Sequence, residues 1–172
     1  MTGTKTRTKW TAKEVAYTGM AVAIIEACKV VMQGLPNIEV TSFFVIMFTL
    51  VLGSKMLIVV PAFTLIEGCI FGFGIWWVMY LYAWPLLALI TWFMRKQNSV
   101  LLYSAVSALF GFGFGALCSI PYLFIGGPAM MFNWWIAGIP FDLIHGVSNF
   151  LIMLFLYKPI RKVMDRIVKE EI

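Results

Sequence analysis

Two triplets of polar residues stand inside apolar segments of this chain at the spacing i, i+3 and i+7. They are Glu26, Lys29 and Gln33, and Asp142, His145 and Asn149. This spacing places the members of each triplet on one face of a helix. Ionisable groups inside a membrane cost several kcal/mol unless they are paired or hydrated, so they commonly line a cavity or a transport path. The two triplets therefore predict a shared polar cavity that binds a polar ligand.

Further polar residues extend this predicted cavity. Glu67 follows Thr64 at nearly one helical turn in another apolar segment, and Asn37 and Glu39 precede a further one. If successive segments run alternately inward and outward, all of these groups lie in the outer half of the bilayer. The full set of predicted substrate-binding residues is Glu26, Lys29, Gln33, Asn37, Glu39, Glu67, Trp76, Asn133, Trp134, Asp142, His145 and Asn149.

Tryptophans gather where apolar segments end on the outer side. Trp76, Trp77, Trp134 and Trp135 occupy these ends, and Asn133 precedes the second pair. Tryptophan rings commonly form a belt at the level of the lipid headgroups. The alternative interpretation is a lid whose rings stack on a flat ligand. The sequence leaves both interpretations open.

Each ionisable group also has a purely structural interpretation. Glu26 and Lys29 could neutralise each other, and Glu67 could be protonated or bonded to Lys29. Asp142 could stabilise the first turn of a helix, where a carboxylate is favourable, and His145 could be an interior histidine. Because the outer set holds four acids against one certain base, either some acids are neutral or the ligand supplies donors or positive charge.

The elements that position these residues are predicted to be membrane helices. The 172 residues are 62% hydrophobic and 12% charged, whereas soluble domains average about 45–50% apolar and about 25% charged residues. A helix needs about 20 apolar residues to cross a bilayer. We predict one all-α membrane domain of six transmembrane helices with a basic tail at 159–172. The spans are predicted at about 11–32, 36–52, 56–73, 76–94, 99–125 and 139–158.

Prolines support two of these boundaries. Pro36 and Pro140 each fit the first turn of a helix, because proline lacks a donor that has no partner there anyway. The second span is therefore predicted to begin at Pro36, and the sixth at about residue 139 with Pro140 in its first turn. The connection before the sixth span is predicted at 126–138.

Basic residues assign the orientation of the spans. Twelve of the thirteen Lys and Arg residues form four clusters outside the apolar segments, and Lys29 is the exception. The clusters are Lys5, Arg7, Lys9 and Lys13; Lys55; Arg95 and Lys96; and Lys158, Arg161, Lys162, Arg166 and Lys169. Lys and Arg concentrate in cytoplasmic loops, so both chain ends are predicted to be cytoplasmic. The tail is predicted to form a short helix on the inner leaflet.

Several chemistries lack their sequence signals. There is no Gly-rich loop for ATP phosphates, no nucleophile elbow and no His-Glu-x-x-His helix, so we do not expect an enzyme. Cys28, Cys69 and Cys118 are odd in number and have no short ligand spacing, so we expect neither a disulfide framework nor a metal site. We expect no cofactor. The basic clusters fit the lipid bilayer, whose inner leaflet is anionic, rather than nucleic acid.

Small residues follow another face of the first span. Ala16, Gly19, Ala23 and Ala27 recur at i, i+3, i+7 and i+11. Small side chains let helices approach closely in lipid. This ridge could pack inside the bundle or form a docking surface for another membrane protein, and the sequence leaves both open.

Two stretches and this general layout resemble one protein family. Residues 35–41 read LPNIEVT and residues 138–150 read GIPFDLIHGVSNF. Together with the basic cytoplasmic loops and the small ridge, they are similar to the corresponding stretches of substrate-binding S components of energy-coupling factor (ECF) transporters. The resemblance covers nearly the whole chain and implies an S-component-like bundle of six spans in a prokaryotic plasma membrane.

The resemblance also implies a function and partners. S components capture a vitamin or related micronutrient at the outer face and dock on a T transmembrane subunit powered by two cytoplasmic ATPase subunits. The family's docking motif is Ala-x-x-x-Ala in the first span, and its nearest matches here are Gly19-x-x-x-Ala23 and Ala23-x-x-x-Ala27. The substrate stays unidentified. The alternative is a self-sufficient carrier or channel with a polar path through the first, third and sixth spans; an accessory subunit without a ligand fits less well.

Overall fold

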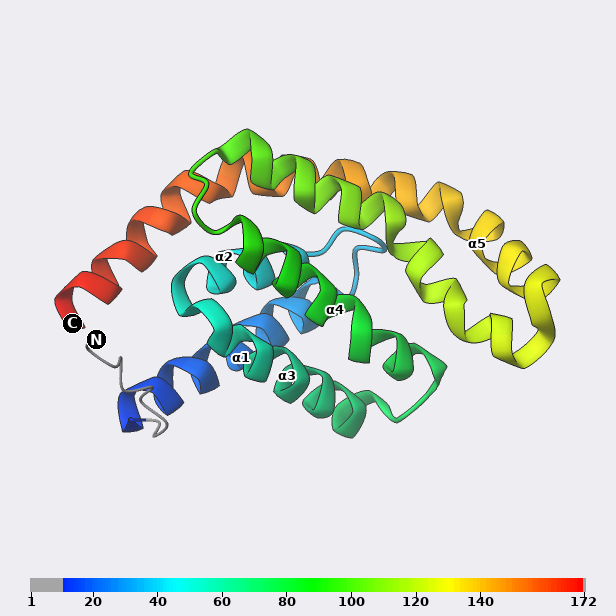
Figure 1. Ribbon diagram of the computed structural model, residues 1–172, viewed down its shortest axis with the longest axis horizontal. Helices are drawn as coiled ribbons and strands as arrows, with labels where there is room; N and C mark the ends of the chain where they lie inside the picture. The colour runs from blue at the N-terminus through cyan, green and yellow to red at the C-terminus, as the bar shows by residue number, and fades with distance from the viewer. Residues whose placement is uncertain (1–10, 172) are drawn as a thin grey trace, which may run out of the picture.

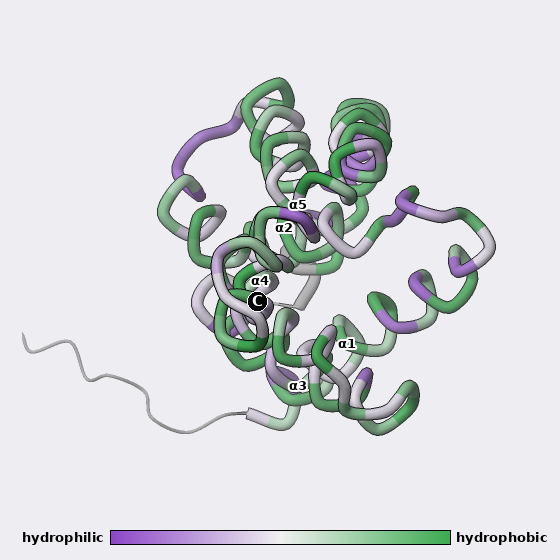
Figure 2. The backbone as a smooth tube through the Cα atoms, turned by 90° about the vertical axis from the view of Figure 1, so that its right-hand side faces the viewer, coloured by the Kyte–Doolittle hydropathy of each residue, from purple (hydrophilic) through white to green (hydrophobic). Residues whose placement is uncertain are grey.

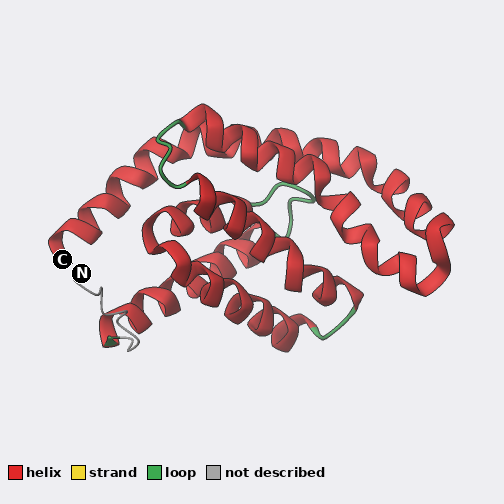
Figure 3. Cartoon of the chain, viewed as in Figure 1, coloured by secondary structure: helices red, strands yellow, loops and turns green. Residues whose placement is uncertain are grey.

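The computed structural model describes residues 11–171, and their side chains as far as residue 167. Lys5, Arg7 and Lys9 of the first basic cluster lie outside the described residues. Within the described range the chain is helical with short loops and has no strand (Figure 3). The elements are α1 (Ala12–Met32), α2 (Thr41–Leu52), the 3-10 turn η1 (Gly53–Lys55), α3 (Met56–Phe71), α4 (Ile75–Met94) and α5 (Val100–Glu171).

Successive elements run back and forth along the long axis of the molecule (Figure 1). The turn η1, the α4–α5 loop and the end of α5 lie at one end of this axis, and a sharp bend in α5 lies at the other. The bend is at Gly126 and Gly127, whose backbone is not helical. Gly127 has φ +77°, a conformation that costs glycine little because it has no Cβ. The bend divides α5 into two arms that lie side by side.

The core is built around α2. Eight of its twelve residues are buried, among them Phe43, Val45, Ile46 and Met47. A helix that is apolar on all sides belongs in the interior, and α2 packs against α1, α4 and α5. By contrast, α1 has only three buried residues, Ala21, Val22 and Ile25. The start of α1 is held by a capping box, in which the Thr11 and Glu14 side chains each accept the other's backbone N–H.

Four helical stretches of the described chain are long and apolar enough to span a membrane. They are Ala12–Met32, Thr41–Phe71, Ile75–Met94 and Val100–Ile167. These stretches indicate a multi-pass membrane protein, and the helices are hydrophobic over most of their length (Figure 2). The prediction of six spans is wrong in its count. With 12 and 16 residues, α2 and α3 are each shorter than the roughly 20 residues of a full crossing, and the fifth and sixth predicted spans fall in the two arms of the bent stretch α5.

Two predicted boundaries are also wrong. The second helix begins at Thr41 rather than at Pro36, because residues 33–40 form a loop that bonds to α5 instead. The predicted connection at 126–138 is helical except at its first two residues. Pro128, directly after the bend, occupies the first-turn position that the sequence had suggested for Pro140. Asp142 is therefore several turns inside the second arm, and its predicted alternative role in a first helical turn is wrong.

The basic tail continues the second arm without a break. Helix α5 runs through Pro159 to Glu171, so the tail is not a separate short helix. Ile160 and Met164 on its apolar face pack against the buried core. The tail is thereby joined to the bundle rather than only to lipid.

Candidate functional site

An ion pair joins α1 to α3. Nζ of Lys29 donates a hydrogen bond to Oε2 of Glu67. The Glu67 side chain is fully buried and that of Lys29 is 23% exposed. Of the two structural interpretations, bonding of Glu67 to Lys29 is confirmed, whereas Glu26 is not the hydrogen-bonded partner of this lysine. We call this contact the α1–α3 pair.

Aromatic rings surround the ammonium group of the α1–α3 pair. Nζ of Lys29 lies 5.1 Å from the ring centres of both Phe71 and Tyr80, and 5.8 Å from that of Trp76. A cation over ring faces is stabilised by about 0.5–2 kcal/mol, more where water is excluded. Trp76, predicted from its position at a span end, thus lies beside the charged group.

Carboxylate oxygens next to the α1–α3 pair have no partner in the described chain. Both carboxylate oxygens of Glu26 and Oε1 of Glu67 are buried and accept no hydrogen bond from described residues. The two carboxyls are close enough to interact electrostatically. Buried acceptors without donors are costly, commonly about 1–3 kcal/mol each. These oxygens are therefore candidates to accept hydrogen bonds from a ligand.

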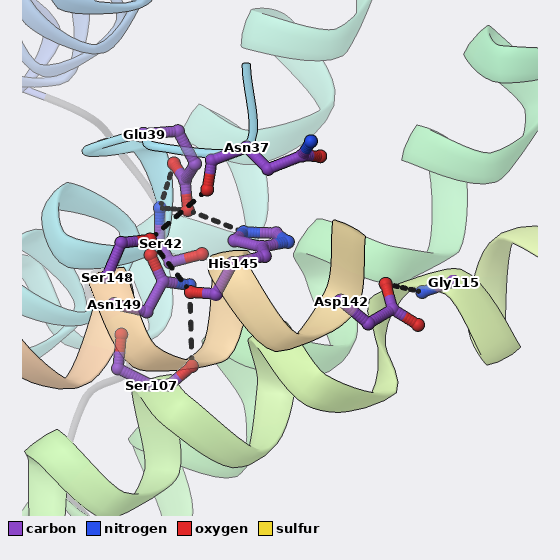
Figure 4. A network of polar contacts seen from close by, with 9 residues as sticks. All are labelled: Asn37, Glu39, Ser42, Ser107, Gly115, Asp142, His145, Ser148 and Asn149. Carbon is purple, nitrogen blue, oxygen red and sulfur yellow. Dashed lines mark hydrogen bonds and ion pairs between the residues drawn. The ribbon is translucent and has the colours of Figure 1, made fainter. Parts of the chain in front are cut away.

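A second pair joins the α1–α2 loop to α5. Nε2 of His145 lies 3.1 Å from Oε1 of Glu39, and the backbone N–H of Ser42 donates to Oε2 of Glu39 at 2.9 Å (Figure 4). Ser148 donates from its hydroxyl to the backbone oxygen of Asn37 at 3.1 Å. We call the Glu39–His145 contact the loop–α5 pair; together these bonds hold the loop against the second arm.

The loop position of Glu39 favours its charged form. Burial opposes ionisation of this carboxyl, but the hydrogen bonds from His145 and Ser42 outweigh burial and hold its pKa below the usual value of 4.5. Glu39 is thus an anion at neutral pH. His145 is consequently engaged with a charged partner rather than isolated in the interior.

The rest of the second triplet bonds to the first arm of α5. Asp142 accepts a hydrogen bond from the backbone N–H of Gly115 at 2.9 Å, and Asn149 donates to the backbone oxygen of Ser107 at 3.4 Å (Figure 4). A Cβ at position 115 would collide with the Asp142 carboxylate, so glycine permits this contact. The second carboxylate oxygen of Asp142 is buried without a partner among the described residues.

A row of aromatic side chains connects the two pairs. Tyr80 contacts Lys29 as described, and Trp84 lies 5.3 Å from Tyr80 and 5.5 Å from Phe114 between ring centres. Phe114 in turn lies 5.1 Å from the His145 ring. We call Tyr80, Trp84 and Phe114 the aromatic row. The two ion pairs thus stand at either end of one row of aromatic side chains, whose central residue, Trp84, is buried in the core. Nε1 of Trp84 is a buried donor without a partner in the described range.

Other predicted residues lie outside this arrangement. Gln33 is exposed at the end of α1, and the Asn37 side chain points away from His145 (Figure 4). Asn133 and Trp134 are exposed, and Trp134 stacks on Tyr122 of the opposite arm with 4.9 Å between ring centres. This segment lies towards the α5 bend, which projects beyond the other helices (Figure 1).

The aromatic row was missed in the sequence, although a signal for part of it exists. Trp76, Tyr80 and Trp84 recur every four residues in α4, which places them on one face of that helix. Phe114 could not be selected, because the first arm is rich in phenylalanine and nothing in the sequence distinguishes the one that contacts His145.

The small ridge of α1 faces outward. Ala16, Gly19, Ala23 and Ala27 are all exposed, and a Cβ added to Gly19 would meet nothing within 4 Å. Of the two interpretations of the ridge, packing inside the bundle is therefore wrong. Its small side chains form an uncovered strip on the helix.

The described residues contain no group of three or more His, Cys, Asp or Glu side chains that could hold a metal ion. Comparison of the chain with protein-family models, with curated proteins and with solved structures finds no match.

Proposed function

We propose that this protein is the substrate-capture subunit, or S component, of an ECF-type importer. The observation that carries the proposal is the convergence of two ion pairs and several unpartnered buried carboxylate oxygens on one aromatic row. Such sites, largely apolar with a few convergent polar groups, are typical of small-molecule binding. The resemblance of residues 35–41 and 138–150 to S components supports the same function, because those two stretches form the loop–α5 pair.

The charges of the site favour one class of ligand. Glu26, Glu39, Glu67 and Asp142 contribute four carboxyls, against the single ammonium of Lys29 and the imidazole of His145. A ligand that donates hydrogen bonds or carries positive charge would satisfy the unpartnered oxygens, and a flat ring would stack on the aromatic row. We propose a vitamin-like heterocycle that carries amino or other N–H donors.

We propose that the bent stretch Val100–Ile167 crosses the membrane in both directions. At about 1.5 Å per residue, the 68 residues of Val100–Ile167 are far longer than a hydrocarbon core of about 30 Å, and the bend at Gly126 and Gly127 reverses their direction. With this topology the α4–α5 loop and the end of α5 lie in the cytoplasm, and the two ion pairs lie nearer the outer face.

Delivery of the ligand would require partners. The exposed ridge of α1 fits close approach of a helix from another membrane protein, which we propose is the T subunit that is energised by two ATPase subunits. The ridge is uncovered in the isolated chain, as a docking surface should be.

The direct test of capture is identification of the ligand. The tagged protein is purified in mild detergent, and small molecules that remain bound are released and identified by mass spectrometry. The compound found should quench tryptophan fluorescence of the ligand-free protein, and Glu26→Gln should weaken its binding by at least about tenfold, as expected for loss of a charge-assisted hydrogen bond. Absence of any bound compound from native membranes would contradict the proposal, and so would unchanged binding of a recovered compound by Glu26→Gln.

The partner claim has a separate test. Purification from native membranes under gentle conditions should recover a T subunit and the ATPase subunits with this chain. Uptake of the ligand into vesicles that contain only this chain would instead favour the self-sufficient carrier.

A further inference from the structure

A basic groove lies at the opposite end of the molecule from the candidate site. It has a volume of about 700 Å³ and is formed by the α4–α5 loop and the last turns of α5. Six of its lining residues are basic: Arg95, Lys96, Lys158, Arg161, Lys162 and Arg166. Asp165 is the one acid among the lining residues. The groove therefore concentrates positive charge in a concave space.

Most of this charge is not neutralised by the described residues. Asp165 pairs with Arg161 at 3.0 Å. Between residues 11 and 167, no carboxylate forms an ion pair with Lys96, Lys158, Lys162 or Arg166. Adjacent like charges repel one another unless an anion lies between them. A bound anion would relieve this repulsion.

The wall of the groove is held in place by buried hydrogen bonds. Tyr103, fully buried in the first arm, donates to the backbone oxygen of Met94 at 2.9 Å or of Gln97 at 3.1 Å. Its ring stacks on Tyr157 with 5.6 Å between centres. The α4–α5 loop is thereby fixed to both arms of α5. The groove is consequently preformed rather than created by flexible surface lysines.

The groove lies at the edge of the apolar surface. Phe93, just before the α4–α5 loop, is 69% exposed, and Leu101, just after it, is 63% exposed. Arg95 stacks on Trp92 with its guanidinium 4.3 Å from the ring centre. Exposed apolar residues belong in hydrocarbon, and tryptophan with arginine is typical of the membrane–water interface. The basic groove thus stands at the level where lipid phosphates lie.

We propose that the basic groove is a specific site for the phosphate headgroup of an anionic phospholipid. Basic pockets between membrane helices on the cytoplasmic side bind such headgroups. Lys96, Lys158, Lys162 and Arg166 contact the phosphate, and the neighbouring apolar surface accommodates the acyl chains. The proposal depends on the chain lying in a membrane and not on its proposed capture function, so either can fail without the other.

Native mass spectrometry of the full chain in detergent tests this site. Phosphatidylglycerol and phosphatidylcholine of equal chain length are titrated, and the fraction of protein with one bound lipid is measured. Phosphatidylglycerol should bind at least about tenfold more tightly. The variant Lys158→Gln/Lys162→Gln/Arg166→Gln should lose on the order of a hundredfold in affinity, since each base near the surface contributes about fivefold.

A charge-matched control distinguishes a specific headgroup site from general electrostatic attraction between the basic protein and an anionic lipid. Lys13→Gln/Lys55→Gln removes two charges from residues that do not line the groove and should reduce affinity less than about threefold, whereas Lys158→Gln/Lys162→Gln removes two charges from its lining and should reduce affinity about 25-fold. If the triple variant fails to fold, the milder variant Lys96→Gln is measured instead, and its affinity for phosphatidylglycerol should fall about fivefold. Equal losses in the two double variants, or equal binding of phosphatidylcholine, would refute a specific headgroup site. Displacement of phosphatidylglycerol by equimolar inorganic phosphate would show a free-phosphate site instead and would equally overturn the proposal.

Discussion

Replacement of Lys29 by methionine is the sharpest perturbation of the candidate site. Lys29→Met retains an unbranched side chain of similar length but removes the ammonium that pairs with Glu67. The Glu67 carboxylate is fully buried and would lose its hydrogen-bond donor. Glu26, whose oxygens already lack partners among the described residues, would lose the nearest positive charge as well. The variant therefore leaves two buried acids without a base.

The magnitude follows from the unequal burial of the two partners. Loss of one member of a buried ion pair costs about 3–5 kcal/mol, and partial exposure of Lys29 favours the lower end, about 3 kcal/mol. Glu67→Gln should cost less, about 1.5 kcal/mol, because the amide keeps the shape and the ammonium retains its aromatic neighbours and access to water. For a chain of this size, about 2–4 °C in Tm corresponds to each kcal/mol. The expected decreases are about 6–12 °C for Lys29→Met and about 3–6 °C for Glu67→Gln.

The assay is thermal unfolding in one detergent, followed by tryptophan fluorescence. The double variant Lys29→Met/Glu67→Gln should be more stable than Lys29→Met alone, because it removes the stranded charge. Lys55→Met is the matched control, since Lys55 pairs with Glu14 across a more exposed contact of 2.7 Å. Screening by water makes such pairs weak, so this variant should change Tm much less.

The reasoning fails if the order of effects is reversed. A Lys29→Met protein as stable as the unmodified one would mean that Glu67 does not depend on the ammonium. A larger decrease in Tm for Glu67→Gln than for Lys29→Met would show that stability depends on the Glu67 carboxylate more than on the Lys29 ammonium. Either result would remove the α1–α3 pair as an organising contact of the site.

Three further predictions concern the loop, the two arms and the ridge. The pKa of Glu39 is lowered in the folded protein, so its contribution to stability is present above about pH 4.5 and is lost as the pH falls further. Glu39→Gln should therefore flatten the dependence of Tm on pH in this acid range. An unchanged pH profile of Tm would contradict this prediction. At position 111 a Cβ would lie 2.8 Å from Cα of Gly146, so Gly111→Ala should destabilise the protein by about 1–3 kcal/mol. Gly113 has open space around it, so the control Gly113→Ala should not. Equal unfolding temperatures of the two variants would show that the arms can separate at no cost. If the ridge docks on a T subunit, Ala23→Trp should abolish ATP-dependent uptake. Ligand binding, measured by fluorescence, should stay within about twofold, as expected for an exposed position without contacts to the site. Loss of binding would instead show that position 23 affects the interior of the bundle.

Local signals in the sequence predicted several elements correctly. The ends of α1, α3 and α4 agree with the predicted spans to within two residues, because apolar runs are bounded there by glycines or basic turns. Burial of Glu67, Asp142, His145 and Asn149 agrees with their placement on interior helix faces. These features depend on residues close together in the chain, which periodicity reports directly.

Boundaries near proline were predicted less well. Pro36 and Pro140 both fit a helix start by local chemistry, yet one lies in a loop and the other inside an arm. Proline at the first turn is permitted rather than required. The α1–α2 loop extends to residue 40 because Glu39 and Asn37 bond to α5, and such distant partners cannot be seen in a local pattern.

The small residues of α1 also show what a local sequence pattern cannot predict. Their spacing predicted a continuous strip, and all four members share the exposed face. Whether that strip faces neighbouring helices or lies uncovered depends on which other face of α1 packs on α2 and α3, and both orientations are compatible with the same spacing. Only the packed bundle distinguishes them.

Composition and periodicity alone thus establish a helical, lipid-compatible chain with basic groups segregated from its apolar segments, because hydration free energies act on each segment independently of its neighbours. The pairing of Lys29 with Glu67 and of Glu39 with His145, and the aromatic row between them, arise only when the helices pack. These contacts join residues from 38 to 106 positions apart, and their energies depend on distance and burial in three dimensions rather than on separation along the chain.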